Sequence, residues 1–244
     1  MKNITIIGKV NGNPYTRRFD SGAIKGRLPV LVTETRKSDD GSENVRETLF
    51  IVEVWNSTAL YCANRFNDGA PVFVDGDLSM VSYTNREGNF DARLVIAARK
   101  VLSAADEAYI NFRGIGNLTR DPEMRYTNET GLPVTNAGIA FNRRYLDSAG
   151  ERQEETLFAD LVAWNGTAEN LDQYTQRGSR LYMESDRLEL DFYTSNQGEP
   201  KVRTKITSAF TQFLSPAGAQ GASAPADGTP AEGASVTEGD DMPW

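Results

Sequence analysis

The chain contains two copies of one pattern. The segment ETLFIVEVWN at 47–56 returns as ETLFADLVAWN at 155–165, about 108 residues later. The same separation aligns three further pairs, which are Gly8 with Gly116, Pro14 with Pro122 and Arg17 with Arg125. Repetition at a fixed distance indicates one structural unit used twice. We therefore expect two domains of one fold, residues 1–105 and 106–215, followed by a tail over residues 216–244.

Each copy reads as short strands bounded by turn residues. In the first copy, stretches rich in β-branched and aromatic residues predict five strands, at 3–10, 30–37, 49–55, 71–83 and 90–101. A helix-like segment that ends in glycine lies between the third and fourth strands, at 57–69 and again at 166–178. Five strands with one helix between the third and fourth is the order of an OB-fold barrel. The predicted class is all-β, with two tandem five-stranded OB-fold barrels.

The tail differs in composition from the two copies. It is rich in Pro, Gly, Ala and Ser, carries five acidic residues and no Lys or Arg, and ends in GDDMPW. Low hydrophobicity with unbalanced charge predicts disorder. The net charge of −8 is concentrated outside the first copy, which is slightly positive. A polyanionic partner would therefore have to bind at local basic patches.

Several classes of function lack the residues they need. The chain has no histidine and a single cysteine, Cys62, which excludes His-based catalysis, nearly every zinc site and an intramolecular disulfide. It also lacks a run of 18 apolar residues that would span a membrane. We expect a cytoplasmic protein that is not an enzyme and needs no metal or cofactor.

Three segments of the second copy carry a family resemblance. GNLTRDPEMRYT at 116–127, the stretch 141–171 and RGSRLYMESDRLELDFYTSNQGE at 177–199 resemble bacterial single-stranded DNA-binding proteins. Two such domains in one chain resemble the Deinococcus–Thermus type, which has two OB-folds per subunit and forms a homodimer. The resemblance implies a nucleoid-associated protein that binds single-stranded DNA in replication, recombination and repair. RNA remains open as a ligand, because base faces are common to both.

The resemblance places base-stacking rings in the second copy at Tyr145, Phe158, Trp164 and Tyr193. Phe158 and Trp164 are six residues apart, so a regular strand puts both on one face, and the interleaved residues 157, 159, 161 and 163 would enter the core. Basic residues beside the rings would neutralise phosphates, although each also fits an ordinary solvated surface. They are Arg120, Arg125, Arg143, Arg144, Lys201, Arg203 and Lys205.

The first copy departs from this pattern. Phe50, Trp55 and Tyr83 match three of the aromatic positions and Arg17 matches Arg125, but residues 20–49 contain no aromatic. Phe50 and Trp55 are five apart, so they face opposite sides unless a bulge intervenes. Either the strand is bulged, or one ring lies in the core. We expect this copy to bind DNA more weakly or along a different track.

The last residues predict a protein-binding tip. The family typically ends in a flexible acidic tip that closes with Pro-Phe, whereas this chain closes with Trp, which needs a wider pocket. The resemblance implies that replication and repair proteins bind Asp240, Asp241, Met242, Pro243 and Trp244. The alternative function is an OB-fold assembly or adaptor protein with incidental nucleic-acid affinity.

Overall fold

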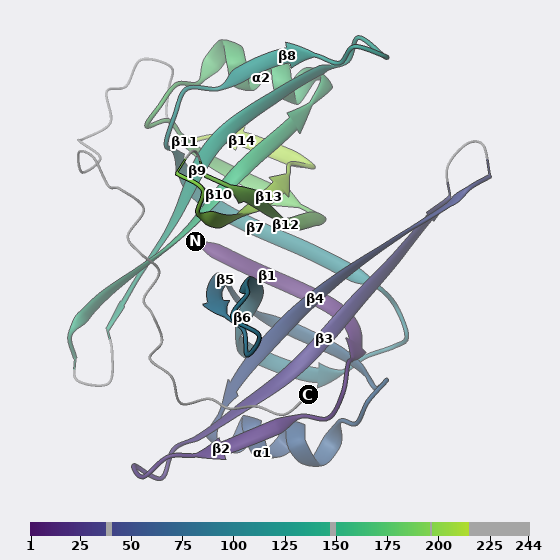
Figure 1. The fold of residues 1–244 in the computed structure, drawn as a ribbon, viewed down its shortest axis with the longest axis vertical. Helices are drawn as coiled ribbons and strands as arrows, with labels where there is room; N and C mark the ends of the chain where they lie inside the picture. The colour runs from purple at the N-terminus through teal and green to yellow at the C-terminus, as the bar shows by residue number, and fades with distance from the viewer. Residues whose placement is uncertain (38–40, 147–149, 196, 215–244) are drawn as a thin grey trace.

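The computed structural model describes residues 1–37, 41–146, 150–195 and 197–214 (Figure 1). Within these ranges the chain is mostly β-strand, with two short helices. The all-β prediction is confirmed. The predicted tail at 216–244, with its acidic tip at 240–244, lies outside the described residues.

Five described strands of the first copy close into a barrel. Strand β1 pairs with β5 and β3, β3 pairs with β4, β4 runs parallel to β6, and β6 returns to β5. The strands are β1 (Lys2–Val10), β3 (Ile24–Lys37), β4 (Glu43–Trp55), β5 (Pro71–Thr84) and β6 (Phe90–Ser103). The short β2 (Tyr15–Arg18) lies against β3, and helix α1 (Asn56–Arg65) follows the third barrel strand, as the OB-fold order requires.

The second copy repeats this topology with two interruptions. The elements are β7 (Tyr109–Leu118), β8 (Glu123–Tyr126), β9 (Pro133–Leu146), β10 (Arg152–Trp164), α2 (Asn165–Tyr174), β11 (Arg180–Ser185), β12 (Arg187–Thr194), β13 (Pro200–Thr207) and β14 (Phe210–Phe213). β11 and β12 together take the place of β5, and β13 and β14 take the place of β6. Strand β10 runs parallel to β13, as β4 does to β6.

The first strand of each barrel bends closely over its neighbours. On β1, Ile4, Ile6 and Val10 are buried and alternate with partly exposed residues, as a strand with one face on the core requires. A Cβ on Gly8 would lie 2.5 Å from the Leu31 carbonyl oxygen. The equivalent Gly116 approaches the Ala140 carbonyl oxygen to 2.7 Å in the same sense. Glycine is needed at both positions because any side chain would collide with the backbone of the second barrel strand, which is β3 in the first barrel and β9 in the second.

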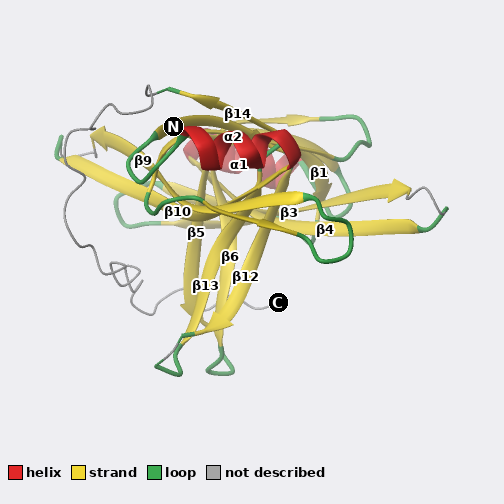
Figure 2. Cartoon of the chain, turned by 90° about the horizontal axis from the view of Figure 1, so that it is seen from above, coloured by secondary structure: helices red, strands yellow, loops and turns green. Residues whose placement is uncertain are grey.

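An antiparallel ladder between β1 and β7 joins the two barrels, from Lys2 opposite Gly114 to Ile7 opposite Tyr109. The long hairpins β3–β4 and β9–β10 extend beyond their own barrels, and the β5–β6 and β12–β13 hairpins project to the same side of the molecule (Figures 1 and 2). Ion pairs cross the junction. The buried Lys2 Nζ lies 2.7 Å from Glu155 Oε1.

Neither described helix is long enough or apolar enough to cross a membrane.

Candidate nucleic-acid interface

Strand β10 presents two aromatic rings to solvent. Phe158 is 58% exposed and Trp164 is 40% exposed. The residues that alternate with them are buried in the core, as predicted, namely Leu157, Ala159, Leu161 and Ala163. The rings are thus held at the surface by a strand whose opposite face is anchored.

Neighbouring strands extend this surface. On β13, Lys201, Arg203 and Lys205 alternate along the strand, and the ladder sets Lys205 beside Asp160 of β10. Across the β12–β13 hairpin, Lys201 lies opposite Tyr193. On the other side of β10, β9 carries Val134 opposite Trp164, and Arg125 of β8 pairs with Val134. We call this surface the outer face of the second barrel. It comprises Arg125, Phe158, Asp160, Trp164, Tyr193, Lys201, Arg203 and Lys205.

Tyr145 does not belong to the outer face. It lies opposite Gln153 in the β9–β10 ladder, so it shares its side of the ribbon with Arg143 and not with Phe158. The Arg143 guanidinium lies 4.9 Å from the centre of the Tyr145 ring and 3.3 Å from Asp77 of the first barrel. The ring is nevertheless 41% exposed. Arg144 points to the other side, where it contacts Glu154 at 3.1 Å.

In the first barrel the two rings predicted on β4 lie on opposite faces of the strand. Trp55 is 48% exposed, whereas Phe50 is fully buried, at 0% exposure. Throughout the described strands β3 and β4 the register is unbroken from Lys25–Trp55 to Lys37–Glu43, so no bulge rotates the strand. The prediction that Phe50 stacks on bases is wrong, because strand alternation places this ring in the core.

Leu49 takes the position that Phe158 has in the second copy. Each residue precedes its tryptophan by six, and the partners in the ladder are Leu31 and Ala140. Leu49 is 44% exposed. The shared ETLF letters conceal this equivalence, because the second copy has one more residue between those letters and the tryptophan. Counting backwards from each tryptophan along the strand would have found it.

The tryptophans occupy equivalent corners between strand and helix. Asn56 and Asn165 follow them with φ of 52°, a left-handed conformation that asparagine tolerates better than most residues. The Asn56 side-chain oxygen accepts a hydrogen bond from the Ile24 N–H at 3.1 Å. This local turn ends the strand and leaves the indole at the barrel rim.

One further ring and one cation lie against Trp55, and a second cation lies against that ring. Phe19 is stacked against it with ring centres 6.0 Å apart and an interplanar angle of 23°. Lys25 Nζ lies 5.6 Å from the Trp55 ring, and the Arg17 guanidinium lies 5.3 Å from the Phe19 ring. Arg17 was predicted from the sequence, but Lys25 was missed. Lys25 could have been found from its position on the strand that pairs with the strand carrying Trp55.

The projecting hairpins carry a matched pair of tyrosines. The Arg93 guanidinium lies 4.0 Å from the centre of the Tyr83 ring, and Arg203 lies 4.2 Å from that of Tyr193. The Tyr83 hydroxyl donates to Asp91 at 2.8 Å, and burial together with this bond raises the pKa of Tyr83. Arg93 was missed in the sequence, although it occupies the same repeat position as Arg203.

Arg120 and Arg203 are not isolated cations. Both contact Asp160, Arg120 at 3.2 Å and Arg203 at 2.9 Å. The acid lies between the two rings of β10 on the outer face, so it would be close to any phosphate bound there.

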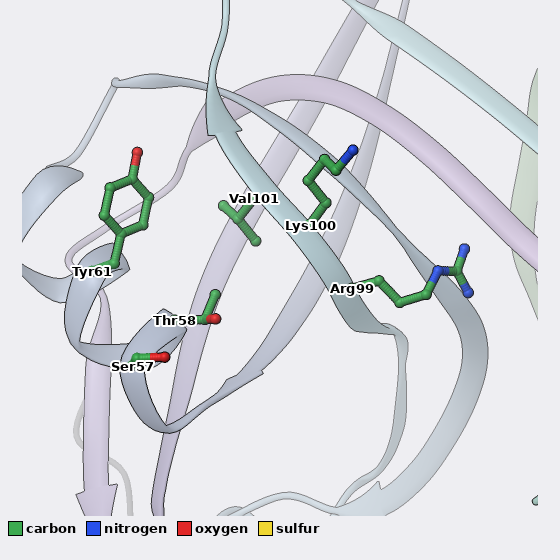
Figure 3. A pocket seen from close by; sticks show the side chains of 6 residues that line it. All are labelled: Ser57, Thr58, Tyr61, Arg99, Lys100 and Val101. Carbon is green, nitrogen blue, oxygen red and sulfur yellow. The ribbon is translucent and has the colours of Figure 1, made fainter.

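A shallow hollow of about 360 Å³ lies between helix α1 and strand β6 (Figure 3). It is lined by Ser57, Thr58 and Tyr61 on one side and by Arg99, Lys100 and Val101 on the other. Arg99 is held by Asp75 at 3.0 Å and Asp77 at 2.8 Å. The hollow contains none of the residues predicted to bind DNA.

Comparisons with known proteins agree with this geometry. The model of the single-strand binding protein family matches residues 1–103 and again 112–214. A protein of Halalkalibacterium halodurans named single-stranded DNA-binding protein is 37% identical over 106 residues, which cover 43% of this chain and 61% of the relative. One of the same name from Deinococcus radiodurans is 26% identical over 247 residues, covering 95% and 81%.

A solved structure extends the likeness to both barrels. The wild-type single-stranded DNA-binding protein of Thermus aquaticus superposes with a TM-score of 0.64 at 20% identity, covering 91% of this chain and 97% of that one. This likeness concerns the fold. The chain spans about three fifths of the length of the first curated relatives it matches. Because the family model matches both copies and thus most of the sequence, the chain belongs to the single-strand binding protein family.

Proposed function

We propose that the chain binds single-stranded DNA without sequence preference and protects it during replication, recombination and repair. The observation that carries this proposal is the β10 strand, on which Phe158 and Trp164 face solvent while every intervening odd-numbered residue is buried. Stacking of a base on an exposed ring is worth about 1–3 kcal/mol. Lys201 and Lys205 lie on the adjoining strand and neutralise phosphates, and Arg203 lies between them on that strand with Asp160 and Asp191 as ion-pair partners.

This chemistry explains why binding does not depend on base sequence and why single strands are preferred over duplex. Every base has a π-face, so stacking does not depend on sequence. In a duplex the faces are already occupied by neighbouring bases, which leaves the phosphates as the shared attraction. Binding of this kind is passive and weakens as salt rises, because condensed counterions are released from the strand.

The two domains, residues 1–105 and 106–215, contribute unequally in this proposal. The second offers Phe158, Trp164 and Tyr193 on one connected surface. The first offers Trp55 and Tyr83 with Arg17, but has leucine at the position of Phe158. We therefore assign the stronger binding to the second domain. Tyr145 adds a separate ring on the other side of the β9–β10 hairpin.

The proposal includes a homodimer and protein partners. The likeness to two-barrel relatives supports an assembly of two chains and four barrels, acting at the nucleoid in the cytoplasm. Replication and repair proteins would bind the tip at 240–244, with Asp240 and Asp241 against a basic rim and Trp244 in an apolar pocket. The C-terminal carboxylate would pair with a cation of that pocket.

Tryptophan fluorescence tests the DNA-binding proposal. The chain has three tryptophans, so a variant with Trp55→Phe and Trp244→Phe leaves Trp164 as the reporter. We expect oligothymidylate to quench its emission to saturation and a duplex of equal length to bind far more weakly. Absence of quenching would favour the adaptor alternative. Light scattering on the same sample measures whether two chains associate.

A further inference from the structure

A carboxylate lies in the middle of the outer face of the second barrel. Asp160 is two residues after Phe158 and four before Trp164, on the same side of β10. Its Oδ1 lies 3.2 Å from Arg120 Nη2 and its Oδ2 lies 2.9 Å from Arg203 Nη1. Each oxygen thus holds one guanidinium, and only 19% of the side chain is exposed. The Asp160 carboxylate therefore lies between two cations, where a phosphate of the nucleic acid could otherwise bind.

The first barrel also has a carboxylate that pairs with two cations beside an exposed ring. Glu53 lies two residues before Trp55 on the outward side of β4, and its Oε1 contacts Lys25 Nζ at 2.8 Å and Arg27 Nε at 3.3 Å. All three side chains are about one-fifth exposed.

The two carboxylates are not copies of each other. The position of Glu53 corresponds to Val162 in the second barrel, and that of Asp160 corresponds to Ile51 in the first. Each barrel therefore supplies its own acid at a different place in the strand. Both barrels thus pair an acid with two cations, although the two acids are not at equivalent positions of the repeat.

The physical effect of such an acid differs between single-stranded and double-stranded partners. Attraction between cations and phosphates is common to every nucleic acid. Stacking on exposed rings is available only to unpaired bases. An acid that neutralises a cation beside the rings therefore removes more affinity from a duplex, which releases about 0.9 counterion per phosphate contact, than from a single strand, which releases about 0.7. The preference for single strands then increases, at the expense of some total affinity.

We propose that Asp160 and Glu53 determine the preference of this chain for single strands over duplex by pairing with cations that would otherwise bind phosphates. The proposal rests on the proposed function. The four cations are Arg120 and Arg203 in the second barrel and Lys25 and Arg27 in the first.

The test compares full-length Asp160→Asn, Glu53→Gln and the double variant with the unaltered chain. Affinities for oligothymidylate and for a duplex of equal length are measured over a salt series. We expect Asp160→Asn to raise duplex affinity about fivefold, as removal of one like charge near a phosphate predicts. Affinity for the single strand rises less, because each phosphate contact releases fewer counterions from a single strand than from a duplex. The ratio between the two affinities falls, and falls further in the double variant.

Salt dependence provides a second readout. Freed cations release more counterions, at about 0.7 per phosphate contact for single strands. Arg203 also contacts Asp191 at 3.1 Å, so Asp160→Asn frees Arg120 fully and Arg203 in part. The slope of log affinity against log salt should steepen by about 0.7–1.4. Adding Arg120→Gln and Arg203→Gln to Asp160→Asn should abolish both gains.

Matched controls separate local pairing from net charge. Asp172→Asn and Glu169→Gln make the same changes of charge on helix α2, where both side chains are exposed and make no ion pair within the described part of the chain. Thermal melting verifies that each variant is folded. The proposal is overturned if Asp160→Asn matches Asp172→Asn, or if it weakens binding to both ligands. If the unaltered chain does not prefer single strands, the proposed function itself fails.

Discussion

Ile4 of β1 lies directly opposite Phe112 of β7, and the two residues hold the same position in the two copies of the repeat. Within their own barrels they pair with Gly76 and Ser185, which are also equivalent. An antiparallel ladder in which a residue faces its own repeat counterpart has a local two-fold axis at that pair. The two barrels are therefore related by a pseudo-two-fold rotation through the Ile4–Phe112 pair.

This pseudo-symmetry extends to the long hairpins. Arg36 of the β3–β4 hairpin contacts Asp186 of the second barrel at 2.7 Å. In the opposite direction, Arg143 of the β9–β10 hairpin contacts Asp77 of the first barrel at 3.3 Å. Asp77 and Asp186 are equivalent in the repeat. Each barrel thus accepts an arginine from the hairpin of the other, which links the hairpins to the relative placement of the barrels.

Phe158→Ala and Phe50→Ala should have different effects, although the two residues stand in the same ETLF motif. The exposed Phe158 should lose about 1–3 kcal/mol of affinity for oligothymidylate with little change in stability. The buried Phe50 should lose about 3–5 kcal/mol of unfolding free energy. Its DNA affinity should stay unchanged at temperatures where the variant is folded. Equilibrium denaturation and anisotropy titration measure the two effects, and a loss of DNA affinity in folded Phe50→Ala would contradict the burial.

Leu49→Phe should strengthen DNA binding by the first barrel. The position is exposed and equivalent to Phe158, so a ring placed there gains a stacking contact worth about 1 kcal/mol or more. Titration of the variant with oligothymidylate checks the gain. Val45→Phe serves as the control, because Val45 is also exposed but lies nearer the hairpin tip. An equal gain from both variants would indicate a nonspecific effect of added apolar surface.

Glycine to alanine substitutions should have opposite signs at two positions. At Gly8 the added methyl group meets the Leu31 carbonyl oxygen at 2.5 Å, and overpacking should cost about 1–3 kcal/mol. At Gly166 in helix α2 nothing lies within 4 Å, so alanine should stabilise by about 0.5–1 kcal/mol through its higher helix propensity. Chemical denaturation of both variants tests the contrast. A stable Gly8→Ala variant would contradict the close approach of β1 to β3.

Glu155→Gln should destabilise the junction of the barrels in a pH-dependent way. Burial lowers the pKa of Lys2, and the contact with Glu155 opposes this. The variant therefore leaves a buried ammonium without its ion-pair partner, at a cost of about 3 kcal/mol. The pKa of Lys2 then falls further. Since the unfolded chain binds this proton more readily, the unfolding free energy should rise with pH up to about 10.5, more steeply than in the unaltered chain. Lys2→Met combined with Glu155→Gln should remove the excess pH dependence.

Cys62 should be unreactive in the folded chain. Its side chain is buried on α1, and burial raises the pKa of the thiol to about 11. The thiolate is the reactive form, so a disulfide reagent near neutral pH should label the native chain slowly and the denatured chain fast. The raised pKa also stabilises the fold fully below about pH 9, and this contribution is lost as the pH rises through about 11. Fast labelling of the native chain would contradict the burial.

The sequence predicted the parts of the site that depend on local order. Strand alternation put Phe158 and Trp164 on one face of the strand and Leu157, Ala159, Leu161 and Ala163 on the other, and the resemblance indicated that the rings face outward. The same rule required Phe50 and Trp55 to part unless a bulge was present, but it could not say which ring is buried. That choice belongs to the ladder of β3 with β4, which is a contact between distant residues. Letter matching also favoured Phe50 over Leu49, because it aligned the two copies at ETLF and not at the tryptophans, and the copies differ by one residue between the two.

The sequence by itself determined that there are two copies of a five-stranded barrel, because turn residues and β-branched runs are local signals and the repeat is visible in the letters alone. It also determined which residue types are available for binding, with rings and cations but no histidine. Only the tertiary structure decided which residues of neighbouring strands share a face. It placed Tyr145 on the opposite side of the β9–β10 hairpin from Phe158. It also placed Asp160 between Arg120 and Arg203 and Glu53 beside Lys25 and Arg27. Most of these pairings join strands or loops far apart in the chain, and their distances depend on how the barrel closes.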